Sequence, residues 1–376
     1  MEMTSLERML AAIDGEPFDK YPAVMVSPFW SLMPHWPELV GLNFLHATYG
    51  TDEEKMRFYE ALHDVVGLDW MPIGGNLSAG SRGSYRVATE DGVPVLVNTG
   101  ARTKTRYKEF PKDMPPEEPL FDTARDVESL LPVPTAEELL ASGEYDFAKK
   151  LVERFGQTVF LWDASLAPFP HCYYVLGHEK LFDAMRSQPD LIFALMERQY
   201  EVLRQQARLA RMLGLHGVDV MEFFCSADLI SEKDYLRFAF PYEQRAIQTI
   251  RDEGLVASMN LMGWIEPRLP HLARLPLNCL QVEAGLKGYH NDLSEVRKGL
   301  GEEVCLFGNA HSVWVIEQGD EDTWRQSAVE QAQALGKQHR YAIGQGTPLT
   351  WATSPEKFRR FIEFTRKMLA ELVPPG

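Results

Sequence analysis

The chain has 376 residues and carries 38 Lys and Arg against 54 Asp and Glu, a formal net charge of −16. A surface this acidic repels phosphate backbones and anionic headgroups, which excludes most nucleic acid and membrane-surface partners. No apolar run approaches the ~20 residues that a membrane-spanning helix needs, so we expect a soluble protein.

The cysteines and the N-terminus indicate a reducing compartment. The cysteines are widely spaced, without a Cys-x-x-Cys pair, and they are Cys172, Cys225, Cys279 and Cys305. This pattern is typical of buried free thiols rather than of a disulfide framework. Residues 1–6 lack the basic region of a secretory signal peptide. We therefore predict a cytoplasmic protein.

The chain opens with a capped helix and two strands. Thr4 and Glu7 have the spacing of a capping box, and Gly15 ends the helix that follows. Short apolar runs at 21–26 and 68–73 predict strands that are buried on both faces.

A β-hairpin is expected after the second strand. Residues 85–88 and 93–97 are rich in strand-forming residues, and they flank an Asp91-Gly92 pair that favours a tight turn. The insertion covers about residues 84–110.

The rest of the chain alternates between strands and helices. Six more strands are predicted at 159–163, 218–222, 256–260, 279–283, 304–309 and 341–345. Helices are expected between them, including 189–213, and a last one begins at Ser354. Eight parallel strands alternating with helices favour a (β/α)₈ barrel of the TIM type, with residues 1–376 as one domain. An open doubly wound sheet is the alternative, but no Gly-x-Gly-x-x-Gly follows a strand.

Polar residues follow these apolar runs where the strands end. The active site of such a barrel lies at the C-terminal ends of its strands, so these side chains are expected to converge on a small-molecule pocket. They are Asn76, Asp163, Glu222, Asn260, Glu283, Asn309 and Gln345.

Aromatic residues and two histidines lie near the same face. Phe29, Trp30 and Trp36 follow the first strand, where they either cap the core or form an apolar lid over a flat ligand. His171 and His311 fall where loops after strands are expected.

A metal site is one interpretation of these polar residues. Glu222, Glu283 and His311 offer ligand types that suit zinc, although ordinary satisfied polar contacts explain the same residues more simply.

Several segments together resemble the uroporphyrinogen decarboxylase superfamily, which also includes corrinoid-dependent methyltransferases. Their order and spacing carry the resemblance, and they are 6–22, 177–181 with 189–190, 230–235 with 241–242, and 306–309. The resemblance implies a (β/α)₈ barrel with its pocket at the strand ends.

The sequence departs from the tetrapyrrole decarboxylases of that superfamily. Their Arg-Gln-Ala-Gly-Arg-Tyr motif has no counterpart in residues 26–33, which lack arginine. Their catalytic aspartate aligns with Asn76 and their histidine with Gln345, and only their loop tyrosine finds a match, at Tyr174. Without cations for substrate carboxylates or an acid at these positions, uroporphyrinogen decarboxylation is not expected.

The sequence also departs from the zinc methyltransferases. Their His-x-Cys-Gly motif aligns with Asn260-Leu261-Met262-Gly263, and the last loop has Thr347 where they carry a cysteine. Asparagine and methionine are not usual zinc ligands, so zinc is not expected at this position.

The leading hypothesis is a methyltransferase that moves a methyl group between a small O- or N-methyl compound and a corrinoid. The corrinoid would arrive on a partner protein or free, because no Asp-x-His-x-x-Gly motif is present, and the resemblance makes a homodimer plausible. The alternatives are a decarboxylase acting on a tetrapyrrole or a smaller aromatic acid, and a non-catalytic barrel that binds a tetrapyrrole or corrinoid.

The hypothesis assigns a role to each candidate residue. Acid or base roles are assigned to Asp163, Glu222, Glu283, His171, Tyr174 and, as an assisting group, His311. Substrate binding is assigned to Asn76, Asn260, Asn309, Gln345, Phe29, Trp30 and Trp36.

Overall fold

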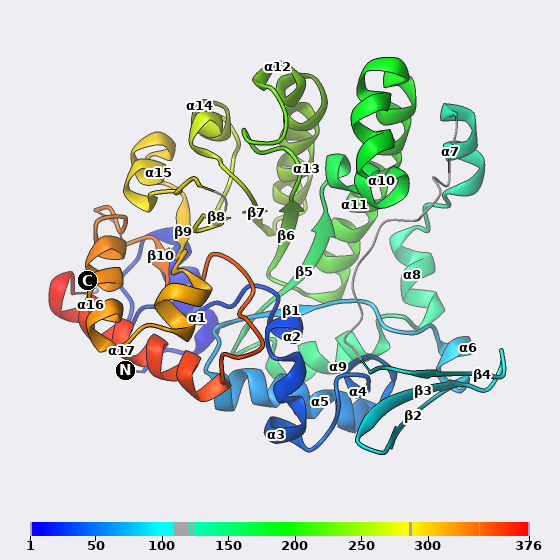
Figure 1. Cartoon of the computed structure of the whole chain (residues 1–376), viewed down its shortest axis with the longest axis horizontal. Coiled ribbons are helices and arrows are strands. Elements are labelled where there is room, and N and C mark those ends of the chain that lie inside the picture. Colours follow the sequence, from blue (N-terminus) through cyan, green and yellow to red (C-terminus); the bar gives the residue numbers. More distant parts are fainter. Residues whose placement is uncertain (1, 109–120, 122, 286–287, 338, 375–376) are drawn as a thin grey trace.

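Seven parallel strands form a curled sheet in the order β1-β5-β6-β7-β8-β9-β10 (Figure 1). The computed structural model describes residues 2–108, 121, 123–285, 288–337 and 339–374. The strands are β1 Trp70–Ile73, β5 Phe160–Leu166, β6 Gly217–Glu222, β7 Val256–Leu261, β8 Cys279–Val282, β9 Cys305–Phe307 and β10 Tyr341–Ala342. Every adjacent pair is parallel, which confirms the predicted α/β class.

The segment around Ala23 lies between the two edges of this sheet. Val24 donates its N–H to the Ile343 carbonyl at 2.9 Å, and Asp69 donates to the Ala23 carbonyl at 2.9 Å. The strand predicted at 21–26 is thus a single bridge rather than a strand. Pro22 has no N–H to extend the ladder, and Ser27, at φ 45°, turns the chain into a helix.

Helices cover the outer face of the sheet and connect consecutive strands (Figure 1). The longer ones are α1 Ser5–Asp14, α5 Asp52–Glu60, α9 Asp146–Phe155, α10 Pro168–Ser187, α11 Pro189–Leu213, α13 Phe240–Asp252, α15 Leu293–Leu300, α16 Glu321–Ala332 and α17 Pro355–Leu372. The shorter ones are α2 Pro28–Ser31, α3 Trp36–Val40, α4 His46–Tyr49, α6 Ala79–Arg82, α7 Ala124–Leu130, α8 Ala136–Ser142, α12 Glu232–Asp234 and α14 Leu269–Leu272. The Thr4 capping box and the helix at 189–213 are confirmed. No helix within the described ranges is long and apolar enough to cross a membrane.

Alternate residues of the strands fill the inside of the curled sheet. Trp70 of β1 stacks on Phe160 of β5 with ring centroids 4.5 Å apart, and it meets Phe307 of β9 edge-on at 5.0 Å. Met9 and Ile13 of α1 pack against this cluster, so α1 closes the N-terminal end of the barrel. All four cysteines are buried and free, as predicted.

A separate antiparallel sheet lies at one edge of the molecule (Figure 1). It contains β2 Tyr85–Glu90, β3 Val93–Asn98 and β4 Thr103–Arg106. β2 and β3 pair across Asp91-Gly92, and β4 adds a third strand that the expected hairpin over 84–110 did not include. Residues 109 and 110 lie outside the described part of the chain. Ring contacts of Tyr85 with Tyr49 attach this sheet to the α4 segment.

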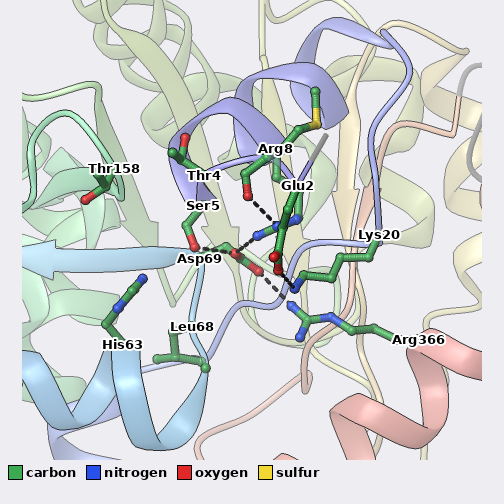
Figure 2. Close-up of a pocket in the computed structure, with 12 residues that line it drawn as sticks. Glu2, Thr4, Ser5, Arg8, Lys20, His63, Leu68, Asp69, Thr158 and Arg366 are labelled. Atoms are coloured by element: carbon green, nitrogen blue, oxygen red, sulfur yellow. Dashed lines mark hydrogen bonds and ion pairs between the residues drawn. The ribbon is translucent and has the colours of Figure 1, made fainter.

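A hollow of about 360 Å³ at the N-terminal end of the barrel contains a network of charges (Figure 2). Asp69 accepts hydrogen bonds from Ser5 Oγ at 2.6 Å, from Arg8 at 2.6 Å, from the Ala23 N–H at 2.8 Å and from Arg366 at 2.8 Å. The network therefore connects α1, the bridge segment, β1 and α17. In barrels of this type the N-terminal face contributes to stability, whereas the opposite face holds the active site.

Candidate active site

Three buried amides form the floor at the C-terminal end of the barrel. Asn260 and Gln281 are register partners on β7 and β8, and Gln281 Nε2 donates to the Gln345 carbonyl at 3.2 Å. Gln345 Nε2 donates to the Val26 carbonyl at 3.5 Å, whereas its buried Oε1 has no protein partner within the described ranges. The predicted residues Asn260 and Gln345 are thus brought together through Gln281, which the sequence reasoning missed.

Glu283 lies two residues beyond Gln281 and is held by two donors. The Gly263 N–H and the Tyr289 hydroxyl each donate to Glu283 Oε2 at 2.7 Å. Burial raises the pKa of Tyr289, and its hydrogen bond to Glu283 raises it further, so the phenol stays protonated. These two hydrogen bonds occupy Glu283 Oε2, so this oxygen does not face open solvent.

A polar cavity of about 530 Å³ opens beside these residues, lined among others by Tyr289, His290, Asn309, His311, Trp314 and Gln331. Asn309 Nδ2 donates to the Asn291 carbonyl at 2.8 Å. His311 Nδ1 accepts the backbone N–H groups of Val313 and Trp314 at 3.2 and 3.3 Å. Burial is the main cause that lowers the pKa of His311. The neutral ring then carries its proton on Nε2, a buried atom without a protein partner among the described residues.

An aromatic cavity of about 430 Å³ lies at the end of β1. Its lining residues carry no charge, and they are Phe29, Met33, Trp36, Phe44, Leu45, Ala47, Thr48, Tyr49, Tyr59, Gly74, Gly75, Asn76 and Tyr107. Phe29 and Trp36 lie 5.6 Å apart, and Trp36 also packs on Phe58 in the core at 4.8 Å. Trp36 thus packs against the core and also lines this cavity, and its role as a cover over a ligand stays a prediction.

Trp30 is separated from the other two aromatic residues of its loop. It packs on Trp351 with ring centroids 5.3 Å apart, and Trp351 Nε1 donates to its carbonyl at 3.2 Å. This contact joins the loop after the bridge segment to the loop after β10.

Asp163 lies behind the wall of the aromatic cavity. Its Oδ1 accepts the Ala164 N–H at 2.9 Å, and its buried Oδ2 has no protein partner in the described ranges. A Cβ placed on Gly74, which lines the cavity, would lie 3.6 Å from Asp163 Oδ1. Burial raises the pKa of Asp163 to about 7, with the Ala164 hydrogen bond opposing the rise. The group can therefore hold a proton at neutral pH.

The expected convergence of Asp163, Glu222 and Glu283 is wrong, and so is the metal site of Glu222, Glu283 and His311. Within the described residues, only Glu222, Cys225 and Glu243 place three ligand atoms within 4.8 Å of one another. Side chains alternate along a strand, so Glu222, at the end of β6, faces α13 rather than the barrel interior.

His171 and Tyr174 lie on α10 rather than in the loop expected at His171. Burial lowers the pKa of His171 to about 4, so its ring is neutral at physiological pH. The ring of Tyr174 contacts Tyr173 at 5.1 Å, and Tyr173 contacts Phe224 at 4.2 Å. The helix bends at Gly177, where φ is 74°.

A comparison with solved structures finds a full-length match of the same fold. A structure described as a methyltransferase from Methanosarcina mazei matches with a TM-score of 0.66 and 18% identity over 97% of this chain and 99% of that chain. A structure described as a native Bacteroidetes-affiliated GH5 cellulase matches with a TM-score of only 0.36 and 11% identity, over 62% of this chain and 76% of that chain. No curated protein matches the sequence. The model of the uroporphyrinogen decarboxylase (URO-D) family matches residues 105–368. Because this match covers well over half of the sequence, the chain belongs to the uroporphyrinogen decarboxylase family.

Proposed function

We propose that this protein is a methyltransferase that moves a methyl group between a small O- or N-methyl compound and a corrinoid. Among such compounds, those whose oxygen or nitrogen is attached to an aromatic ring are favoured. The observation that carries the proposal is the aromatic cavity, which combines an uncharged lining with a buried carboxyl group directly behind it. A polyanionic tetrapyrrole would need cations that this lining does not supply, whereas a neutral ring would pack against Phe29, Tyr59 and Tyr107.

The residues of the cavity have distinct roles in this proposal. The aromatic rings hold the substrate ring, and Asn76 offers an amide to orient its polar substituent. Asp163 lies behind Gly74 and holds a proton at neutral pH. A departing oxygen or nitrogen requires such a proton. Tyr59 lines the cavity, and burial, followed by the charge of Asp163, raises the pKa of its hydroxyl, so it remains a hydrogen-bond donor.

The exposed indoles at the C-terminal face fit a large flat cofactor. Trp314 is 63% exposed and Trp351 is 36% exposed, and both follow late strands of the barrel. Apolar ring faces of this kind would hold a corrin macrocycle brought by a partner protein or free in solution. When bound, a reduced corrinoid supplies the strong nucleophile that methyl transfer needs. Asn260, Met262 and Thr347 do not fit zinc, so the proposal uses no metal there.

The test is an anaerobic assay of the full chain with reduced corrinoid and a panel of methoxylated and N-methylated compounds. Methylation of the corrinoid by one donor, lost in Tyr59→Phe and Asp163→Asn but kept in the exposed variant Asp183→Asn, is the expected result. Formation of coproporphyrinogen from uroporphyrinogen in a parallel reaction would instead support the decarboxylase alternative. Corrinoid binding without turnover of any donor would support the non-catalytic alternative.

A further inference from the structure

A thiol and two carboxylates meet in a buried cluster between the end of β6 and α13. Glu222, Cys225 and Glu243 are 1%, 2% and 0% exposed. Each offers one ligand atom, and these atoms all lie within 4.8 Å of one another. Neither the proposed methyl transfer nor the amide floor uses this cluster.

The hydrogen bonds of the cluster leave one oxygen without a partner. Cys225 Sγ donates to Glu243 Oε1 at 3.3 Å, and the Tyr235 hydroxyl donates to Glu243 Oε2 at 2.6 Å. Glu222 Oε1 is buried and has no protein partner among the described residues. A buried carboxylate oxygen without a partner is costly, so Glu222 requires either a proton or a cation close to it.

The charges around the cluster favour a divalent cation. Arg268 is buried and donates to the Cys225 carbonyl at 3.3 Å and to the Ile230 carbonyl at 2.7 Å, and it lies over the Tyr235 ring at 4.5 Å. It is a fixed positive charge in direct contact with Cys225 and near enough to Glu243 to lower the pKa of that carboxyl group. Two carboxylates and a thiolate carry three negative charges. The single positive charge of this guanidinium and the two positive charges of one divalent ion balance them.

We propose that Glu222, Cys225 and Glu243 bind one divalent cation of the zinc class. A thiolate selects zinc-like ions over magnesium and calcium, which prefer oxygen ligands alone. The 3.3 Å separation of Cys225 Sγ and Glu243 Oε1 suits two ligands of one tetrahedral ion, with bonds of about 2.3 and 2.0 Å. This position differs from the Asn260 to Gly263 segment, where methyltransferases of the superfamily hold zinc. The ion would tie the C-terminal end of β6 to α13.

The experiment compares metal content in the wild-type protein and three variants. Full-length wild type, Cys225→Ala, Glu222→Gln and Cys279→Ala are purified from zinc-supplemented cultures and analysed by elemental mass spectrometry. Cys279→Ala is the matched control, because it also removes a buried free thiol, from the barrel interior. The expected result is about one zinc per chain in wild type and Cys279→Ala, with a loss of at least severalfold in the other two.

Cobalt substitution gives a second readout that does not depend on variant stability. Cobalt added to metal-stripped wild type and Cys279→Ala should produce the near-ultraviolet absorption of a thiolate–cobalt bond, and Cys225→Ala should not. Wild type without zinc and without this absorption would overturn the proposal in favour of a proton shared by the carboxyl groups. Full zinc content in Glu222→Gln would also overturn the assignment. Neither readout requires methyl transfer, so failure here and failure of the proposed function are distinguishable.

Discussion

Asp163 is the residue whose chemistry depends most on its surroundings. It lies on β5 behind the wall of the aromatic cavity, it is only 5% exposed, and burial raises its pKa to about 7. In the unfolded chain the same carboxyl group titrates near pH 3.9. Between these two values the folded protein holds a proton that the unfolded chain has released.

The first prediction concerns activity. If protonated Asp163 assists the leaving group, the transfer rate should fall as pH rises through about 7, because the proton is then lost. Asp163→Asn should lower the rate by about 10²–10⁴-fold, the usual contribution of a general acid, and should remove this limb of the pH profile. An unchanged profile in the variant would show that another group supplies the proton.

The second prediction concerns stability. Because the folded pKa of Asp163 is raised, its contribution to stability is complete below about pH 4 and is lost as pH rises through about 7. Within that window Asp163 should lower the unfolding free energy by at most about 1.4 kcal/mol for each increase of one pH unit. Asp219 and Glu243, whose pKa values burial raises to about 6 and about 7, should add losses of the same sign. Urea unfolding at several pH values should therefore show a smaller loss in Asp163→Asn than in wild type, the difference being the share that Asp163 contributes. Parallel pH dependences for the two proteins would contradict the buried environment of this carboxyl group.

At the scale of elements, one carboxylate holds four segments together. Asp69 is 2% exposed and accepts hydrogen bonds from α1 and α17 (Figure 2), as well as from the Ala23 N–H of the bridge segment. Its removal takes their shared partner from Arg8, which is buried and keeps only Asp19 as an ionic partner within the described ranges, and from the half-buried Arg366.

We therefore expect Asp69→Asn to destabilise the protein by about 3–5 kcal/mol, the usual effect of breaking a buried ion pair. The control is Asp146→Asn, which removes an exposed carboxylate bonded to Arg82 and Lys149, and which should cost less than about 1 kcal/mol. Chemical unfolding followed by circular dichroism measures both. A similar small loss for the two variants would mean that the network contributes little.

Most of the strands of the parallel sheet could be predicted from the sequence, but the faces of the strands could not. Apolar runs located β5 to β10, and the capping box located α1. In β6, however, Val218 and Val220 are as buried as Asp219, because the strand is covered on both sides. A run without alternation does not reveal which side chains point inward, so Glu222 was placed with Glu283 instead of with Glu243. Contacts such as Asp163 behind Gly74 depend on packing that no local pattern encodes.

At the scale of the whole molecule, we predict that residues 1–376 unfold as one cooperative unit. The parallel sheet runs from β1 to β10, and α1 and α17 both attach at the base of β1 (Figure 1), so no part of the sheet is independent of the rest. Far-ultraviolet circular dichroism and the fluorescence of the eight tryptophans should give coincident unfolding curves. Two separated transitions would contradict this single-domain organisation.

The contact between Asp69 and Arg366 also has a consequence for synthesis in the cell. These residues are 297 positions apart, and ribosomes add roughly 5–20 residues per second. From these rates, Asp69 waits on the order of 15–60 s for its last partner to be translated. During that interval the β1 edge and the apolar inner face of the growing sheet are incomplete, and such exposed edges and surfaces are prone to aggregation.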